Sequence, residues 1–405
     1  MKKKYADLHL HPSTKAFLTE ENALDKKDCW HTFDIIPIAN ELDSQSNLDQ
    51  ITKGNVHLSI AAIIPGERAF FKSPRINFFG AILADASDNF ILKIARNKIS
   101  YLQLLNAEIQ HLKKSVDEID LERNGRDTVQ IINHVGEATE DDKSYLILAI
   151  EGGHATSLNS DDGDVNHLEG LEKMFKSHHR FLYLTLAHLA DQGKNYLSNH
   201  TFGTYFLKNK GFRPQRIGIS VDGFNAIDLC YKNNPTVLID IKHMSLLARK
   251  QFYVYRKKQN YKHPLIASHV AVTGRSWDDF LTTQIGSPFF RGKNKEWIVV
   301  THKRPRGIGK GNKWHEQTYF NPWSINLFDE DILEIYQSKG IIGLILDRGI
   351  LGCVKKRDLR KINEYEQLVI DGKVEAIREE NKFTRGYLKR TQEFFNSKEY
   401  FNLTF

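Results

Sequence analysis

The chain has 405 residues, a net charge of +7, 40% hydrophobic residues and 26% charged residues, a composition typical of a soluble globular protein with one large α/β domain or two domains. The scattered basic residues match no nucleic-acid-binding motif and no run approaches the length of a membrane span, so we expect neither a nucleic acid nor a membrane as partner. The three cysteines lie far apart in the sequence, which argues against a disulfide framework. The start of the sequence lacks an apolar segment of signal-peptide length, so we expect a cytoplasmic location.

Seven short apolar runs alternate with segments of helical periodicity, a pattern that favours parallel strands joined by helices. The predicted strands are Tyr5–Leu10, Val56–Ile64, Tyr145–Ile150, Phe181–Leu186, Val237–Ile241, Pro264–Ser268 and Gly340–Leu346. Helices are predicted over residues 90–119, 168–178, 220–234, 245–258 and 329–337, and residues 127–135 are a short strand or an edge segment. No clear eighth strand follows.

Two histidines close the first predicted strand. His9 and His11 are separated by one residue, so on a strand they project to the same side, as two imidazoles must in order to share a metal ion. Neutral imidazole suits zinc and similar divalent ions. The pair therefore predicts part of a metal site.

Ionisable residues also end most of the later strands. Glu151 follows the run YLILAI and is succeeded by Gly152 and Gly153, which let the backbone turn sharply beside a ligand. The other strand-end residues are His188, His243, His269 and Asp347. If the strands form a barrel, all of these residues meet at one rim, where Glu151 is suited to bridge two divalent ions.

Two segments stand apart from this pattern. Residues 281–323 are rich in Gly, Lys and Arg and are predicted to be an insertion, either a solvated loop or a surface for an acidic partner. Residues 353–405 are charged and helical in pattern. We therefore expect a barrel domain over residues 1–352, interrupted by the insertion, and a separate C-terminal segment.

Several ordered motifs resemble the membrane (renal) dipeptidase family of the amidohydrolase superfamily. The resemblance covers about residues 5–352 and rests on AIEGGHA at 149–155, RFLYLTLAH at 180–188, LIDIKH at 238–243, PLIASH at 264–269 and NLFDEDILEIYQSKGIIGLIL at 326–346. It implies an α/β fold, a metal-dependent TIM-like (β/α) barrel, here with its eighth strand missing or degenerate.

The resemblance also implies a reaction and a role for each site residue. The family reaction is hydrolysis of a dipeptide, a small-molecule substrate, by a water activated between two divalent ions, expected to be Zn. By analogy, His9 and His11 hold one ion, His243 and His269 hold the other, and Glu151 bridges both. His188 contacts the substrate, so that Glu151 and His188 are the catalytic residues, and Arg275 binds a substrate carboxylate. A homodimer is the candidate assembly.

The chain departs from the family pattern in two places. His11 stands where the family usually has an aspartate, and no strand-eight aspartate is found, since Asp347 follows the seventh strand. Three hypotheses therefore stay open: a dipeptidase-like metallohydrolase, a related hydrolase of cyclic amides or phosphoesters, and an inactive metal-binding scaffold or partial chain.

Overall fold

The computed structural model describes most of the first 345 residues of the chain. The described ranges are 5–19, 27–33, 46–72, 88–277 and 324–345, with gaps at 126, 141, 159–165, 178, 202–211, 213, 215 and 275. The predictions for Arg275, Asp347, the 281–323 insertion and the 353–405 segment lie outside these residues.

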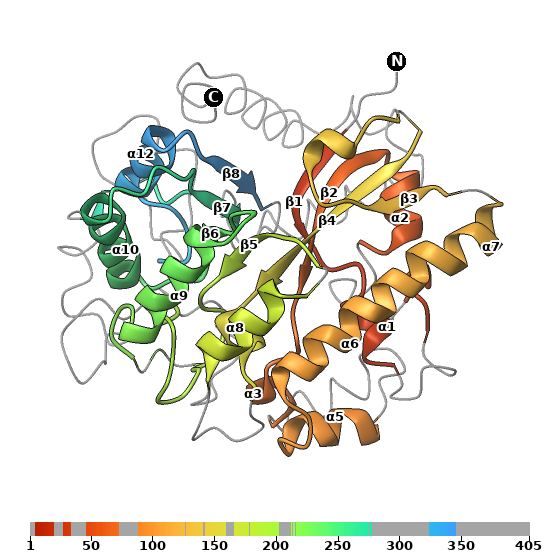
Figure 1. Cartoon of the computed structure of the whole chain (residues 1–405), viewed down its shortest axis with the longest axis horizontal. Helices are drawn as coiled ribbons and strands as arrows, with labels where there is room; N and C mark the ends of the chain where they lie inside the picture. Colours follow the sequence, from red (N-terminus) through yellow and green to blue (C-terminus); the bar gives the residue numbers. More distant parts are fainter. Residues whose placement is uncertain are drawn as a thin grey trace, which may run out of the picture.

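A single parallel sheet forms the centre of the molecule (Figure 1). Its main path runs β1-β2-β4-β5-β6-β7-β8, and every neighbouring pair is parallel. The strands are β1 Tyr5–Leu10, β2 Val56–Ile63, β4 Ser144–Glu151, β5 Phe181–Thr185, β6 Leu238–Asp240, β7 Ile266–Val270 and β8 Ile341–Leu344. A short strand, β3 Val129–Ile131, pairs with β4 off this path. All seven predicted strands are therefore present.

The two ends of the sheet approach each other. A Cβ atom added to Gly343 of β8 would lie 1.9 Å from the Ser268 carbonyl oxygen of β7 and 3.2 Å from the Leu8 Cβ of β1. Strand β8 thus packs closely against both neighbours, although the described residues show no backbone pairing between β8 and β1. The sheet is a TIM-like α/β barrel with one unsealed seam.

Helices surround the strands on the outside (Figure 1). They are α1 Thr14–Phe17, α2 Leu48–Lys53, α3 Arg68–Phe71, α5 Asp88–Ala95, α6 Tyr101–Lys114, α7 Asp120–Asn124, α8 His167–Phe175, α9 Val221–Lys232, α10 Leu246–Lys258 and α12 Asp329–Gln337. One π-helical turn, Ser115–Ile119, and two short 3₁₀ turns, Val135–Glu137 and Gly153–Thr156, complete the described elements. Among the described residues, no helix has the length and apolar character needed to cross a bilayer.

The single helix predicted over residues 90–119 is wrong, because the chain breaks between α5 and α6. Asn97 has a left-handed backbone with φ of 57°, a conformation that ends a helix. Ser100 then starts α6, where its side chain accepts the amide of Gln103 and the Gln103 side chain accepts the amide of Ser100. The apolar periodicity continues across the break and conceals it.

Alternation along each strand separates two layers of core. On β4, Tyr145, Ile147 and Ala149 belong to a cluster inside the barrel, whereas Leu146, Leu148 and Ile150 join the larger cluster beneath the helices. Glu151 continues the inward-facing series at the carboxyl end of the strand, since side chains two apart share a face. The period of the strand therefore aims this carboxylate into the mouth of the barrel.

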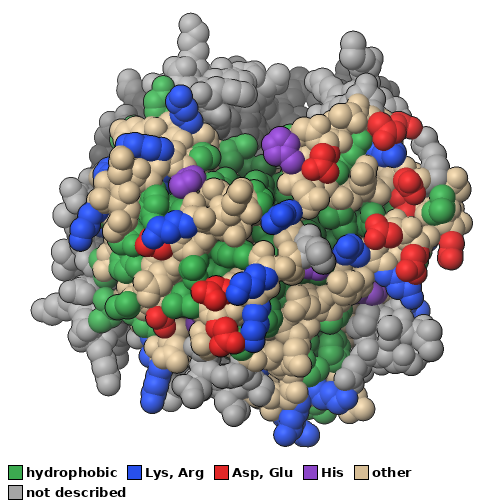
Figure 2. Space-filling view, viewed as in Figure 1, with side chains coloured by type: hydrophobic (Ala, Val, Ile, Leu, Met, Phe, Trp, Pro, Cys, Tyr) green, Lys and Arg blue, Asp and Glu red, His purple; other side chains and the backbone are tan. Residues whose placement is uncertain are grey.

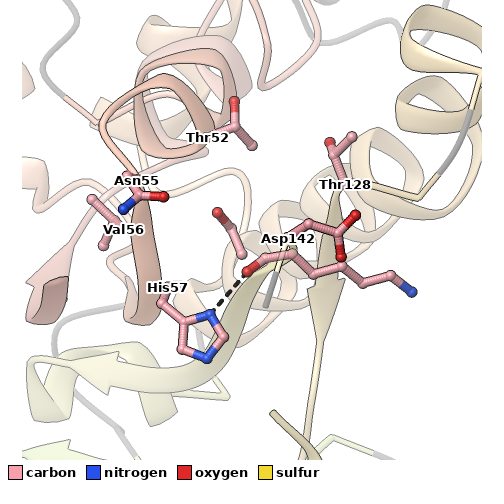
Figure 3. A pocket seen from close by; sticks show the side chains of 8 residues that line it. Thr52, Asn55, Val56, His57, Thr128 and Asp142 are labelled. Atoms are coloured by element: carbon pink, nitrogen blue, oxygen red, sulfur yellow. Dashed lines mark hydrogen bonds between the residues drawn. The ribbon is translucent and has the colours of Figure 1, made fainter. Parts of the chain in front are cut away.

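A small polar pocket of about 150 Å³ lies at the end of the barrel where the strands begin (Figure 3). It lies at the amino ends of β2 and β4 and is lined by residues such as Asn55, His57 and Thr128. The His57 Nδ1–H donates to the Lys143 carbonyl oxygen over 3.0 Å, which joins β2 to the start of β4. This pocket is separate from the strand-end histidines, which lie at the carboxyl ends.

The charged side chains are mixed on the face shown in Figure 2. Lys and Arg side chains are spread over this face and alternate with Asp and Glu instead of forming one basic patch. The described residues on this face therefore show no continuous basic track of the kind that binds a nucleic-acid backbone.

A buried ion pair joins α10 to α12. The Arg249 guanidinium lies 2.9 Å from Asp331 Oδ2, and the Tyr253 hydroxyl donates to Asp331 Oδ1 over 2.8 Å. Arg249 also donates to the Ser324 and Asn326 carbonyl oxygens. The pair fixes the segment that leads into β8.

We predict that Asp331→Ala destabilises the protein by about 3–5 kcal/mol, because it leaves a buried guanidinium without its carboxylate. Urea unfolding of the variant and the wild type measures the difference in free energy of unfolding. The exposed Asp117, changed to Ala, serves as the control and should cost less than about 0.5 kcal/mol. Equal stabilities of Asp331→Ala and the wild type would contradict the assignment.

Candidate metal centre

The structure gathers five histidines around one carboxylate. Glu151 Oε1 lies 3.3 Å from His9 Nε2, 3.2 Å from His243 Nε2, and 3.6 Å from both His188 Nε2 and His269 Nε2. Glu151 Oε2 lies 3.2 Å from His11 Nε2. These six residues lie at or just after the carboxyl ends of five strands, β1, β4, β5, β6 and β7, and all six were predicted from the sequence.

Two overlapping groups of these residues have the spacing of metal ligands. One consists of His9, His11 and Glu151, and the other of Glu151, His243 and His269. In each group the candidate ligand atoms lie within 4.8 Å of one another. Glu151 belongs to both groups and is only 1% exposed, so it is placed to bridge them.

Two unusual backbone conformations place the side chains. Gly152 has a φ of 89°, and a Cβ there would lie 2.4 Å from the His154 ring, so only glycine allows the turn directly after Glu151. His243 also has a left-handed backbone, with a φ of 66°, which is uncommon for a residue with a side chain. Such conformations concentrate at functional sites.

Hydrogen bonds on the far side of His11 and His9 fix the tautomers of these two imidazoles. His11 Nδ1–H donates to the Ala62 carbonyl oxygen over 2.8 Å, because a carbonyl can only accept. His9 Nδ1–H donates over 2.8 Å to the Tyr183 hydroxyl, whose own proton goes to the Leu8 carbonyl oxygen. The third ring, His269, has Ser268 Oγ at 2.8 Å from Nδ1. In their neutral forms, His9 and His11 then each carry on Nε2 a lone pair that faces Glu151.

This arrangement fits a bound cation. His9 Nε2 and His11 Nε2 are 3.2 Å apart, and with both Nδ1 atoms protonated this contact places two lone pairs against each other. The bare nitrogens also face an anionic oxygen of Glu151. A divalent ion between these atoms would replace the repulsion between lone pairs with coordination. Hydrogen-bond partners on Nδ1, such as Tyr183 for His9 and Ala62 for His11, are typical of metal-binding histidines.

The protonation states are those that a metal requires. Burial lowers the pKa of His11 to about 4 and that of His243 to about 3, and it holds the pKa of His269 well below its ordinary value. Burial alone would raise the pKa of Glu151, but the adjacent His9 and His188 rings hold it well below the usual range. The neutral imidazoles of His11, His243 and His269 beside an ionised carboxylate suit a divalent ion near pH 7.

His188 differs from the other four histidines because it has a carboxylate partner of its own. Its Nδ1–H donates over 2.9 Å to Glu67 Oε2, while Glu67 Oε1 accepts the amide of Ala190. Burial opposes the charged ring, but Glu67 and Glu151 outweigh it and raise the pKa of His188. Burial likewise opposes ionisation of Glu67, and the charge of His188 lowers its pKa to about 2.

Glu67 is a residue of this site that was not predicted from the sequence. It follows Pro65-Gly66 at the carboxyl end of β2, the one strand end to which no ionisable residue was assigned. That position was the available signal. His154, the histidine of the GGH motif, donates instead to the Pro65 carbonyl oxygen over 2.9 Å and lies 3.9 Å from Glu67.

Comparison with known proteins gives similarity at the level of solved structures. No family model and no curated protein matches the chain. Three of the similar structures are described as a dipeptidase or a metallopeptidase. The probable dipeptidase PvdM from Pseudomonas aeruginosa is 14% identical with a TM-score of 0.46, and the match covers 82% of this chain and 63% of PvdM.

Two further structures belong to the same group. A metallopeptidase from Rhodobacter sphaeroides, solved with a phosphinate mimic of the dipeptide L-Ala-D-Ala, is 15% identical with a TM-score of 0.43, over 92% of this chain and 83% of its own. The metallopeptidase dipeptidase AC is 14% identical with a TM-score of 0.38, over 76% and 68%. This chain therefore spans less than two thirds of the length of PvdM.

We predict that Glu67→Gln lowers the pKa of His188 in the metal-free chain, because the Glu67 carboxylate is the main group that raises it. An NMR titration of the histidine ring protons measures the shift. Glu118→Gln, at an exposed position, is the matched control and should leave the titration of His188 unchanged. A pKa of His188 equal in the wild type and Glu67→Gln would show that the pair does not act as described.

Proposed function

We propose that this protein is a metal-dependent hydrolase that cleaves a dipeptide or a related small amide. The observation that carries the proposal is the Glu151 carboxylate facing the Nε2 atoms of His9, His11, His243 and His269 from within 3.2 to 3.6 Å. The motifs around these residues, which resemble those of the membrane dipeptidase family, support the choice of an amide substrate.

The residues present divide into two sets of ligands. His9 and His11 would hold one divalent ion, His243 and His269 a second, and Glu151 would bridge the two. Imidazole nitrogen with one carboxylate favours zinc among the available ions. When bound, such a pair of ions supplies a water of lowered pKa and polarises the carbonyl group of the substrate.

His188 would stabilise the charge that develops on the substrate. Its Nδ1–H is held by Glu67, so the ring presents Nε2 to the site, 3.6 Å from Glu151 Oε1. The raised pKa of His188 favours the form that carries a proton on Nε2. A hydrogen bond from this proton to a forming oxyanion is stronger in the transition state than in the bound substrate.

A second candidate reaction is hydrolysis of a phosphoester or a cyclic amide. The observation that favours it is His11, an imidazole at the position where the dipeptidase family usually has a carboxylate. Among the described residues, Glu151 is therefore the only carboxylate in the two ligand groups. A site with fewer negative ligands is more positive when loaded and is better suited to an anionic substrate. The cytoplasmic location and the homodimer stay predictions.

We predict that the purified chain binds about two zinc ions and that Glu151→Ala loses both, because Glu151 belongs to both ligand groups. Elemental analysis after zinc loading and removal of free ion measures the content. Glu108→Gln removes the charge of a buried carboxylate bonded to Ser13 and Thr14, outside both groups, and should retain the zinc of the wild type. Absence of zinc in the wild type would overturn the proposal.

We predict that the zinc-loaded chain hydrolyses dipeptides and that His188→Ala lowers kcat by about 10²- to 10³-fold, the usual cost of losing one oxyanion donor. A panel of dipeptides, a cyclic amide and a phosphate ester, assayed at equal zinc occupancy, measures the turnover. Cleavage of the ester or the cyclic amide alone would favour the second candidate. Full zinc occupancy with no turnover of any substrate would identify an inactive scaffold.

A further inference from the structure

A buried carboxylate lies in the barrel below the candidate metal centre. Asp240 of β6 is fully buried, and its side chain faces inward between Thr185 of β5 and Ser268 of β7. It accepts four hydrogen bonds, from the Thr185 and Ser268 hydroxyls and from the Lys242 and Ser268 amides, at 2.6 to 3.1 Å. Burial raises the pKa of Asp240, and the hydrogen bonds from Ser268 and Lys242 oppose that rise and hold the side chain in one orientation.

Ser268 connects this carboxylate to the centre. Its hydroxyl proton is donated to Asp240 Oδ2 over 2.6 Å, so toward other groups Ser268 Oγ can only accept. Two imidazole nitrogens approach it, His269 Nδ1 at 2.8 Å and His9 Nδ1 at 3.4 Å. Because His9 has a closer acceptor in Tyr183, the main partner of Ser268 is His269.

We propose that Asp240 and Ser268 form a positioning relay that fixes the tautomer of His269, and this proposal deepens the proposed metal-dependent function on which it rests. Asp240 takes the proton of the Ser268 hydroxyl, and Ser268 Oγ in turn accepts the Nδ1–H of His269. The ring then directs the lone pair of Nε2 toward Glu151, 3.6 Å away. Asp240 and Ser268 are positioning residues, since neither belongs to the ligand groups.

The relay also reaches the other ligand group. The His9 and His269 rings stack with their centroids 3.7 Å apart, and each belongs to a different ligand group. Ser268 Oγ lies near the Nδ1 atom of both rings, so its loss removes the acceptor of His269 and a secondary neighbour of His9. We therefore expect the ion held by His243 and His269 to be affected more than the ion held by His9 and His11.

The first test reads the tautomer directly in the metal-free chain. Nitrogen-15 NMR of histidine-labelled protein at neutral pH, with His269 assigned by the loss of its signals in His269→Gln, distinguishes a protonated from a bare ring nitrogen. The wild type should show His269 protonated on Nδ1 only, and Ser268→Ala should show both tautomers. A wild type protonated on Nε2, or a Ser268→Ala variant with an unchanged tautomer, would overturn the relay.

The second test measures zinc affinity. Ser268→Ala should weaken the more affected ion by about 10- to 100-fold, the usual effect of removing an outer partner of a metal-binding histidine, and Asp240→Asn should weaken the same ion. The matched control is Thr185→Val, which removes another hydroxyl bonded to the same Asp240 oxygen but touches no ligand histidine, and its affinity should stay within about 3-fold of the wild type.

The results separate the relay from the proposed function. Equal zinc affinity of Ser268→Ala and the wild type, or an equal loss in Thr185→Val, would contradict the relay while leaving the metal centre in place. A wild type that binds no zinc would overturn the proposed function, and the tautomer measurement on the metal-free chain would still decide whether Asp240 and Ser268 orient His269.

Discussion

The site depends most on the carboxylate of Glu151, which is buried at the mouth of the barrel. It faces the Nε2 atoms of five histidines. A buried anion costs free energy unless positive charge or hydrogen-bond donors compensate it. The Nδ1–H groups of His9 and His11 point away from Glu151, to Tyr183 and Ala62, so in their neutral rings the nitrogens next to it bear lone pairs. A divalent cation between them would satisfy the carboxylate and these rings together.

The barrel explains how residues from distant parts of the sequence reach this point. Parallel strands bring their carboxyl ends to one edge, and alternation along β4 and β6 directs Glu151 and Asp240 inward. The seam between β8 and β1 lies beside the site, where Gly343 allows β8 to approach both Ser268 and Leu8. Inside the barrel, Tyr183 of β5 and Ser268 of β7 contact the Nδ1 atoms of His9 and His269. The strands that build the barrel therefore also orient the candidate ligands.

Much of the fold and the six central site residues could be predicted from the sequence because both follow simple periodicities. Apolar runs mark the strands, and an ionisable residue directly after a run marks the active edge of a parallel sheet. Glu67 was missed because it follows a Pro-Gly turn instead of the strand itself, and its partner His188 lies far away in sequence. The relay through Asp240 was equally hidden, since an aspartate inside an apolar strand reveals its partners only when β5, β6 and β7 lie side by side.

Anomalous X-ray diffraction at the zinc edge, from crystals grown with zinc, locates any zinc ions bound beside Glu151. We predict two peaks flanking Glu151, one within bonding distance of His9 and His11 Nε2 and the other of His243 and His269 Nε2, at the usual zinc–nitrogen length of about 2.0–2.1 Å. No peak beside Glu151 in zinc-grown crystals, or peaks only at other residues, would contradict the account.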